Sequence, residues 1–539
     1  MADAGRTRAA GVLVPLFSIP STRSWGIGEI GDLEPMAAWL KEAGMGILQL
    51  LPINEMAPGQ SSPYSAISAM AIDPIFISLR DVRDFTEPGG DSRLELADQI
   101  TLRAARDRSR IDYLAVRRVK EHALRLAFSY FWDVDWIRGT GRAGAFAAFC
   151  AWEEWWLADY ALFRALRERS GGASWTAWED GLRTREPEAL SRARDELADE
   201  ILFYQYQQWV ADEQWQLARE RTAPVKLFGD FPFMVATDSA DVWAHQHLFR
   251  FDASVGVPPD AFSATGQDWG LPVYRWDVME QQDYSWLRQR VRRSARLFDG
   301  YRIDHLVGFY RTYSRRTGDS EGRFDPPDVP GQLALGERLM EIFKAGGSRI
   351  IAEDLGVVPD FVRESLSRMG IPGYKVFRWE REWDAPGQPV RHPAAYPGLS
   401  VATTSTHDTD TLASWWRTAP SDERKAFLAL PELTGAAHAS NDDDGGWNAD
   451  FRDRLLKLLY QSSSDLLLLP IQDVFGWEER INTPATVSDE NWTWRLPWPV
   501  DRLLVEPEAQ ERGRALRAFA EETDRAHQPS EASRSHERR

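Results

Sequence analysis

Cysteine is nearly missing from this chain, with Cys150 the single cysteine among 539 residues. One cysteine can form no disulfide within the chain and cannot build a cysteine-based metal site. No apolar run is long enough to span a bilayer. The N-terminal segment MADAGRTRAAG also lacks the apolar stretch of a signal peptide. These absences predict a cytoplasmic protein that does not insert into membranes.

Basic residues are also scarce relative to acidic ones, with 64 Lys and Arg against 82 Asp and Glu and a net charge of −18. Nucleic acids and anionic membrane surfaces require basic patches, so we expect neither as a partner. Aromatic residues, by contrast, are plentiful, with 24 Trp, 25 Phe and 14 Tyr. Their flat faces suit sugar rings, although filling a core is their commoner use.

Eight short apolar runs alternate with helical segments, as expected for buried parallel strands. The runs are GVLVPLFSI (from Gly11), GILQLLPI (Gly46), VKLFGDFPF (Val225), GYRIDH (Gly300), SRIIAEDL (Ser348), GYKVFRW (Gly373), SVATTSTHD (Ser400) and LLLLPIQD (Leu466). Eight strands that alternate with helices predict an α/β fold, a (β/α)8 TIM barrel.

The gap between the second and third runs is much longer than one crossover requires. We therefore expect residues 1–84 to be the first part of a catalytic barrel and residues 85–222 to be an inserted, mainly helical subdomain. Residues 223–523 then form the remainder of the barrel, with no C-terminal β-sandwich. The polar tail 524–539 is predicted to be disordered.

The segment GIGEIG at residues 26–31 matches the glycine pattern of dinucleotide-binding folds. Such a site needs its glycines directly after a strand. Here residues 20–25 intervene, so we interpret the match as accidental.

Three acids at the ends of apolar runs are the main candidates for chemistry: Asp304, Glu353 and Asp408. In a (β/α)8 barrel, catalytic groups lie at the C-terminal ends of the strands. Three carboxylates that converge there would stabilise positive charge. Each acid also has a structural explanation.

Asp304 follows Arg302 by two positions, so both side chains should point to the same side of the strand. A neighbouring arginine favours the ionised carboxylate, which a nucleophile toward an anomeric carbon must be. A structural Arg–Asp pair is the alternative. His305 is either a core histidine or a donor to a substrate hydroxyl.

Glu353 follows the small Ala352 and an apolar run, which favours a partly desolvated carboxyl with a raised pKa, as a general acid requires. Its neighbour Asp354 must face the other way, and an ordinary acid at a strand end is the alternative. Asp408, beside His407, is suited to hold sugar hydroxyls and oppose an oxocarbenium charge. Alternatively, or in addition, Asp408 is the N-cap of a helix that starts at residues 411–412.

Asp304 and Glu353 are 49 residues apart, which places them on successive strands. Adjacent barrel strands lie about 4.7–4.9 Å apart. Retaining glycosidases hold their two carboxyls about 5–5.5 Å apart. If the two acids lie at matched heights, they meet the spacing of a retaining pair.

From about Gly11 to Pro497 the chain resembles the 4-α-glucanotransferases (amylomaltase or disproportionating enzyme) of glycoside hydrolase family 77. The most specific segment is GVPPDAFSATGQDWG at residues 256–270, which is similar to the active-site loop of that family. Further similar motifs are Ser62-Pro63-Tyr64, GDFP from Gly229, SADVW from Ser239 and NWTWR from Asn491.

The resemblance implies that Asp304 is the nucleophile, Glu353 the acid/base and Asp408 the stabiliser of the transition state. It also implies a set of sugar-binding residues. Arg302, His305 and His407 hold the sugar in the cleavage subsite, Asp230 lies in the same wall, Tyr64 stacks on that sugar, and Trp269 packs against the acceptor-side glucose.

The chain departs from the family pattern at three positions. Ala261 replaces a tyrosine, Leu271 replaces an asparagine after Trp269-Gly270, and Thr409 replaces an asparagine after His407-Asp408. The catalytic acids are unchanged, so the reaction class stands. Because the missing tyrosine removes a stacking face, acceptor recruitment is expected to differ.

The resulting hypothesis is a 4-α-glucanotransferase that acts by retaining double displacement and needs no metal or organic cofactor. Its donor is a maltodextrin, starch or glycogen chain, and its acceptor is glucose or another glucan. An amylase-type α-glucan hydrolase and a non-catalytic glucan-binding protein are the alternatives. The insert is expected to support the substrate groove or, alternatively, to form an oligomer contact.

Overall fold

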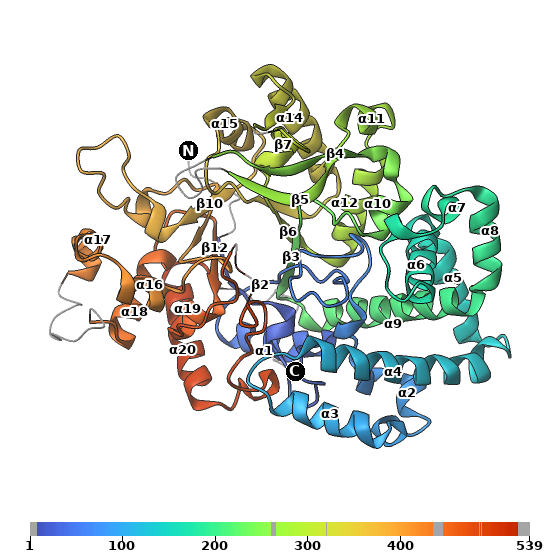
Figure 1. Cartoon of the computed structure of the whole chain (residues 1–539). Helices are drawn as coiled ribbons and strands as arrows, with labels where there is room; N and C mark the ends of the chain where they lie inside the picture. The colour runs from blue at the N-terminus through green and yellow to red at the C-terminus, as the bar shows by residue number, and fades with distance from the viewer. Residues whose placement is uncertain are drawn as a thin grey trace, which may run out of the picture.

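Eight parallel strands close into a barrel in the computed structural model, which describes residues 8–259, 266–319, 321–434, 446–484, 486 and 488–526. Its strands are β1 (Ala9–Leu13), β2 (Ile47–Gln49), β3 (Lys226–Phe231), β6 (Gly300–Ile303), β9 (Arg349–Ala352), β10 (Gly373–Val376), β11 (Ser400–Thr403) and β12 (Leu466–Pro470). Their order around the barrel is β1-β12-β11-β10-β9-β6-β3-β2. The eight predicted strands and the TIM barrel are confirmed (Figure 1).

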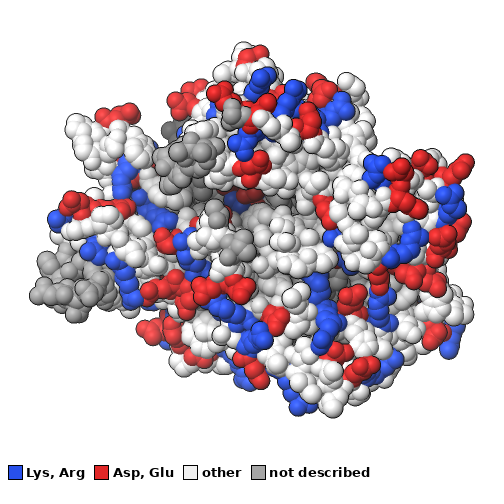
Figure 2. All heavy atoms as spheres, viewed as in Figure 1, with Lys and Arg blue, Asp and Glu red and all other residues white. Residues whose placement is uncertain are grey.

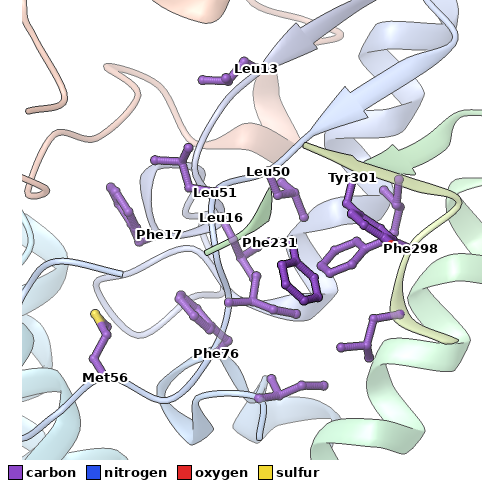
Figure 3. Packing of buried hydrophobic residues seen from close by; sticks show 14 of the residues in the cluster. Leu13, Leu16, Phe17, Leu50, Leu51, Met56, Phe76, Phe231, Phe298 and Tyr301 are labelled. Carbon is purple, nitrogen blue, oxygen red and sulfur yellow. The ribbon is translucent and has the colours of Figure 1, made fainter. Parts of the chain in front are cut away.

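Side chains alternate between the interior of the barrel and its outer wall, because successive residues of a strand point to opposite faces. The interior cluster is apolar and includes Phe228 and Ile351. On the outer wall, the rings of Phe231 and Tyr301 stack at 5.7 Å, and Figure 3 shows Phe298 beside them. Since Tyr301 faces outward, its neighbour Arg302 faces the interior.

A helical region between β2 and β3 covers one side of the barrel, at the right and bottom of Figure 1. Its helices are α2 (Arg83–Thr86), α3 (Leu96–Asp107), α4 (Tyr113–Phe131), α5 (Gly141–Trp152), α6 (Glu154–Arg169), α7 (Asp180–Arg183), α8 (Pro187–Glu196) and α9 (Ala198–Thr222). Helix α9 also packs on the barrel, where the Trp215 indole donates to the carbonyl of Leu297 at 2.8 Å. The last helix of the region is thus part of the barrel wall.

The other helices follow individual strands or close the barrel. They are α1 (Leu33–Glu42), α10 (Ala240–Ala244), α11 (Trp276–Gln281), α12 (Ser285–Leu297), α13 (Val307–Tyr310), α14 (Val329–Ala345), α15 (Asp360–Arg368), α16 (Leu412–Thr418), α17 (Ser421–Leu428), α18 (Ala449–Tyr460), α19 (Ile471–Phe475) and α20 (Pro507–Glu522). Among the described residues no helix is long and apolar enough to cross a membrane.

A second, antiparallel sheet was not predicted. It has the order β5-β4-β7-β8, with strands β4 (Phe249–Val257), β5 (Gln267–Tyr274), β7 (Thr312–Arg316) and β8 (Arg323–Asp325), and lies at the top of Figure 1. The segment 256–270, expected to be a loop, therefore ends β4 and begins β5, while its central residues 260–265 lie outside the described residues. The alternation of apolar and polar residues in FRFDASVGV, from Phe249, was the sequence pattern that could have predicted strand β4.

The glycine-rich segment 26–31 is a packed turn. A Cβ atom at Gly28 would lie 1.8 Å from the carbonyl oxygen of Leu16, so only glycine fits there. The close approach of the backbone therefore explains why a glycine occupies position 28.

The start of the predicted tail is ordered, so its boundary at 524 was wrong. Arg525 is 1% exposed. Its guanidinium donates to the backbone carbonyls of Tyr460, Ser462 and Ser464. Residues from 527 onward lie outside the described residues. Within the described part that follows β12, the chain forms helices and no further strand.

Acidic and basic side chains alternate over the face seen in Figure 2, despite the net charge of −18. This face presents no continuous basic surface. The mixture agrees with the many exposed ion pairs, such as Arg83 with Glu87.

Candidate active site

Asp304 and Glu353 directly follow two neighbouring barrel strands. In the register of β6 and β9, Ile303 pairs with Ala352, so the next residue on each strand is at the same height. The backbone N–H of Glu353 donates to the carbonyl of Ile303 at 3.0 Å, which continues the pairing to the acid itself. The matched height that the sequence argument assumed is present.

Arg302 connects three side chains at this end of the barrel. Its Nη2 donates to Asp304 Oδ1 at 2.7 Å and to the hydroxyl of Tyr64 at 3.0 Å, while Nε donates to Asp230 Oδ2 at 2.9 Å. Burial alone would lower the pKa of this guanidinium, but the surrounding carboxylates, Asp230 foremost, raise its pKa well above the usual value. Arg302 is therefore a permanent cation that faces the carboxylate of Asp304.

Glu353 has the properties of a general acid. Burial raises its pKa from 4.5 to about 7, although Arg302 opposes the rise. Its oxygens accept hydrogen bonds from the backbone N–H groups of His305, at 2.8 Å, and Leu355, at 2.9 Å. Asp354 faces away, as expected, and accepts from the N–H of Tyr374 at 2.7 Å.

His305 lies between Glu353 and the second sheet. Its backbone is left-handed, with φ 43°, and this turn aims its N–H at the Glu353 carboxyl. Burial lowers the pKa of its imidazole to about 4, so the ring is neutral at pH 7. The ring packs edge-on against Trp269, with centroids 4.9 Å apart.

Asp408 lies five residues beyond the end of β11, in a turn rather than on the strand. Its carboxylate accepts from the side-chain amide of Asn482 at 2.7 Å and lies 3.3 Å from His407 Nε2. Burial opposes ionisation, but these two partners hold the pKa of Asp408 well below its usual range. The proposed N-cap role was wrong, because Thr411 caps α16 by accepting from the N–H of Ser414.

Tyr64 and His407 form the wall that contains Asp230. Their rings stack at 5.6 Å, and the Tyr64 hydroxyl donates to Asp230 Oδ2 at 2.8 Å. Burial and the nearby Asp230 raise the pKa of Tyr64 well above its usual value, so it remains a donor. The second carboxylate oxygen of Asp230 has no partner among the described residues.

The helical insert holds the segment that carries Tyr64. Arg117 of α4 makes two hydrogen bonds to the carboxylate of Asp73, at 3.0 and 2.8 Å. Gln208 of α9 pairs with both backbone groups of Ile72, at 3.0 and 2.8 Å. These buried contacts fix the chain that follows β2.

Two residues of the site were missed by the sequence analysis. Asn482 binds the Asp408 carboxylate, and no strand or motif marked it. Trp492 packs against both Tyr64, at 5.8 Å, and His407, at 5.9 Å. The NWTWR motif that contains Trp492 was recognised in the sequence, but no role was predicted for the Trp492 ring. That motif was the sequence signal that could have placed Trp492 at the site.

The three departures from the family pattern have different surroundings. Ala261 lies outside the described residues. Leu271 is in β5, half-buried, and packs against the main hydrophobic core. Thr409 closes the turn that contains Asp408, because its hydroxyl oxygen accepts from the N–H of Thr406 at 3.0 Å.

Contacts therefore bring the nine predicted site residues together around the C-terminal ends of the barrel strands, with Trp269 reaching His305 from β5 of the second sheet. Two carboxyls lie at matched height, one beside a guanidinium and one with a raised pKa, which is the arrangement that a nucleophile and a general acid require. Within the described part of the chain, no group of three or more His, Cys, Asp or Glu side chains is arranged to hold a metal ion.

Comparison with known proteins identifies relatives along the whole chain. The family model described as 4-alpha-glucanotransferase, of glycoside hydrolase family 77, matches residues 14–501. The 4-alpha-glucanotransferase of Thermus thermophilus is 36% identical over 534 residues, which cover 96% of this chain and 99% of the relative. That of Chlamydia caviae is 32% identical over 92% of both chains.

Solved structures give the same result. The amylomaltase from Streptococcus agalactiae, solved in complex with acarbose, superposes with a TM-score of 0.81 at 27% identity, covering 97% of this chain and all of that one. The amylomaltase from Corynebacterium glutamicum gives a TM-score of 0.76 at 25% identity, covering 94% of this chain and 75% of that one.

Proposed function

The chain belongs to the 4-alpha-glucanotransferase family, glycoside hydrolase family 77, and we propose that it transfers α-1,4-glucan segments by double displacement on Asp304. The observation that carries this assignment is the pairing of Asp304 and Glu353 at matched height on β6 and β9. Adjacent strands lie about 4.7–4.9 Å apart, and retaining enzymes hold their two carboxyls about 5–5.5 Å apart, so this pairing supports a retaining mechanism.

In the first half of the reaction, Glu353 donates its proton to the glycosidic oxygen, and the carboxylate of Asp304 attacks the anomeric carbon. The bond to the leaving chain breaks as the covalent glucosyl-enzyme forms. In the second half, Glu353 removes the proton from the 4-hydroxyl of the acceptor glucan. The acceptor oxygen then attacks the anomeric carbon and releases Asp304, so two inversions give net retention.

Positive charge develops on the sugar in both transition states. The carboxylate of Asp408, which keeps its charge because of His407 and Asn482, opposes that charge. Arg302 holds the Asp304 carboxylate in place until it attacks. The unpartnered oxygen of Asp230 is available to a sugar hydroxyl.

Transfer requires that an acceptor glucan outcompetes water. The relatives are transferases by name, which favours transfer over the amylase-type hydrolysis that three acids alone would allow. Incubation with maltotriose tests the proposal. We expect glucose together with a ladder of longer maltodextrins, whereas products shorter than maltotriose alone would overturn it in favour of hydrolysis. Binding of maltodextrin without any product would support the non-catalytic alternative.

The proposed partners are an α-1,4-glucan donor and a glucose or maltodextrin acceptor. We include in the proposal that the helical insert supports the substrate groove, since it fixes the segment that carries Tyr64. The proposal also includes a cytoplasmic location, which cell fractionation with antibody detection would test.

A further inference from the structure

Trp269 lies in a bulge of the second sheet. In the pairing of β4 with β5, Val255 pairs with Leu271 and Gly256 with Asp268, so Trp269 and Gly270 have no partner on β4. A bulge of this kind turns a side chain out of the regular pattern of a strand. Gly256 permits it, because a Cβ atom there would lie 2.0 Å from the carbonyl oxygen of Gln267.

One carboxylate, that of Asp268, closes this bulge. Its Oδ1 accepts from the N–H of Gly270 at 3.0 Å and from the hydroxyl of Ser254. An aspartate that accepts from the N–H two residues later forms an Asx turn, which fixes the backbone between them. That backbone belongs to Trp269, and Gly270 completes the turn with φ +66°.

A second contact links the turn to β7. The other oxygen of Asp268 accepts from Arg315 Nη2 at 3.2 Å. Both side chains are partly exposed, at 43% and 34%, and exposed pairs contribute little to stability. The hydrogen bonds of the turn, rather than the ion pair, are therefore expected to hold the bulge.

The turn is connected to the reacting groups through two contacts. The Trp269 ring packs edge-on against His305, whose N–H donates to the Glu353 carboxyl. A change in the direction of Trp269 would alter the surface beside the acid/base, where the acceptor must approach. It would leave the Arg302 and Asp304 side of the site untouched.

We propose that Asp268 is a positioning residue, which holds Trp269 against His305, the hydrogen-bond donor to Glu353, and thereby favours a glucan acceptor over water. The inference rests on the proposed transferase function. Asp268 touches no reacting atom, so its effect should appear in the second half of the reaction.

The test uses maltotriosyl fluoride as donor and glucose as varied acceptor, with release of fluoride, transfer product and free maltotriose measured together. With the donor well below its KM, fluoride release reports the first half-reaction, and the ratio of transfer product to free maltotriose reports the second. We compare D268A, which loses the turn, with D268N, which keeps an acceptor oxygen for Gly270 N–H. D252A is the matched control, since Asp252 is another ion-paired aspartate of the same sheet.

For D268A we expect a rise in the KM for glucose of about five- to tenfold, as for the loss of one or two hydrogen bonds, and a larger share of free maltotriose. Fluoride release should change much less. D268N should recover most of the acceptor affinity, and D252A should match the unsubstituted protein.

Three results would overturn the inference: an unchanged KM for glucose in D268A, equal effects of D268A and D268N, or parallel loss of fluoride release and transfer in D268A. Failure of the proposed function itself would look different, because the unsubstituted protein would then form no transfer product from glucose at all.

Discussion

Replacement of Glu353 by alanine separates its role as an acid from the role of Asp304. With maltotriose as donor, the leaving oxygen needs a proton, and loss of a general acid costs about 10²–10⁴ in rate. With maltotriosyl fluoride the leaving fluoride needs no proton, so the first half-reaction should survive. Added azide needs no general base and should intercept the glucosyl-enzyme to give an α-glycosyl azide.

The pH dependence follows from the pKa of Glu353, which burial raises to about 7 from 4.5. At pH 7 about half of the molecules carry the catalytic proton, whereas a carboxyl with the ordinary pKa would be protonated in roughly one molecule in 300. Because the acid form is the active one, kcat/KM for maltotriose should fall about tenfold per unit above this pKa.

The fall in rate above pH 7 should be absent when the E353A variant is assayed by fluoride release from maltotriosyl fluoride. Three outcomes would refute the reasoning: an equal loss of rate with both donors, a glycosyl azide of β configuration, or a fall in rate above pH 7 that persists in E353A.

Three further substitutions test the surroundings of the site and the end of the chain. Y64F leaves a buried carboxylate and guanidinium each short of a partner, which costs the folded protein about 1–3 kcal/mol. We therefore expect Tm to fall by a few degrees and kcat/KM for maltotriose to fall about 5- to 150-fold, because Tyr64 no longer fixes Asp230 and Arg302; an unchanged kcat/KM would contradict this. N482A removes a hydrogen bond to the Asp408 carboxylate and should lower kcat about tenfold with little change in KM. A change in KM alone would argue against a role of Asp408 in the transition state. R525M should destabilise the protein by about 2–4 kcal/mol and lower its Tm, because the buried guanidinium of Arg525 binds several backbone carbonyls. R514M, at an exposed position of α20, should leave Tm unchanged. Equal Tm values for the two variants would contradict a stabilising role for Arg525.

The barrel could be predicted from sequence because each of its strands lies in a short, mainly apolar run between helical segments. Two catalytic candidates followed directly, since Asp304 and Glu353 are the first residues after such runs. The pairing of β6 with β9 was also predictable, because the two strands are successive in the barrel. Their carboxyls could be placed only once the register was known.

The remaining features depend on contacts that leave no local pattern. Asn482 reaches Asp408 across 74 residues from an irregular segment. Arg525 stands in a polar sequence, and its burial depends on carbonyl groups far away in the chain. The segment 256–270 was interpreted as a loop from its resemblance to the family's active-site loop, and the strands of the second sheet, which alternate only partly between buried and exposed residues, were not predicted.

The central claim is that Asp304 forms a covalent bond to the glucan. The most direct measurement is mass spectrometry of the E353A variant after brief reaction with maltotriosyl fluoride and digestion with trypsin. The peptide IDHLVGFYR, residues 303–311, contains Asp304 as its only carboxylic acid side chain. We predict that this peptide gains one maltotriosyl group. A maltotriosyl group on the peptide that contains Asp408, or fluoride release without any labelled peptide, would contradict it.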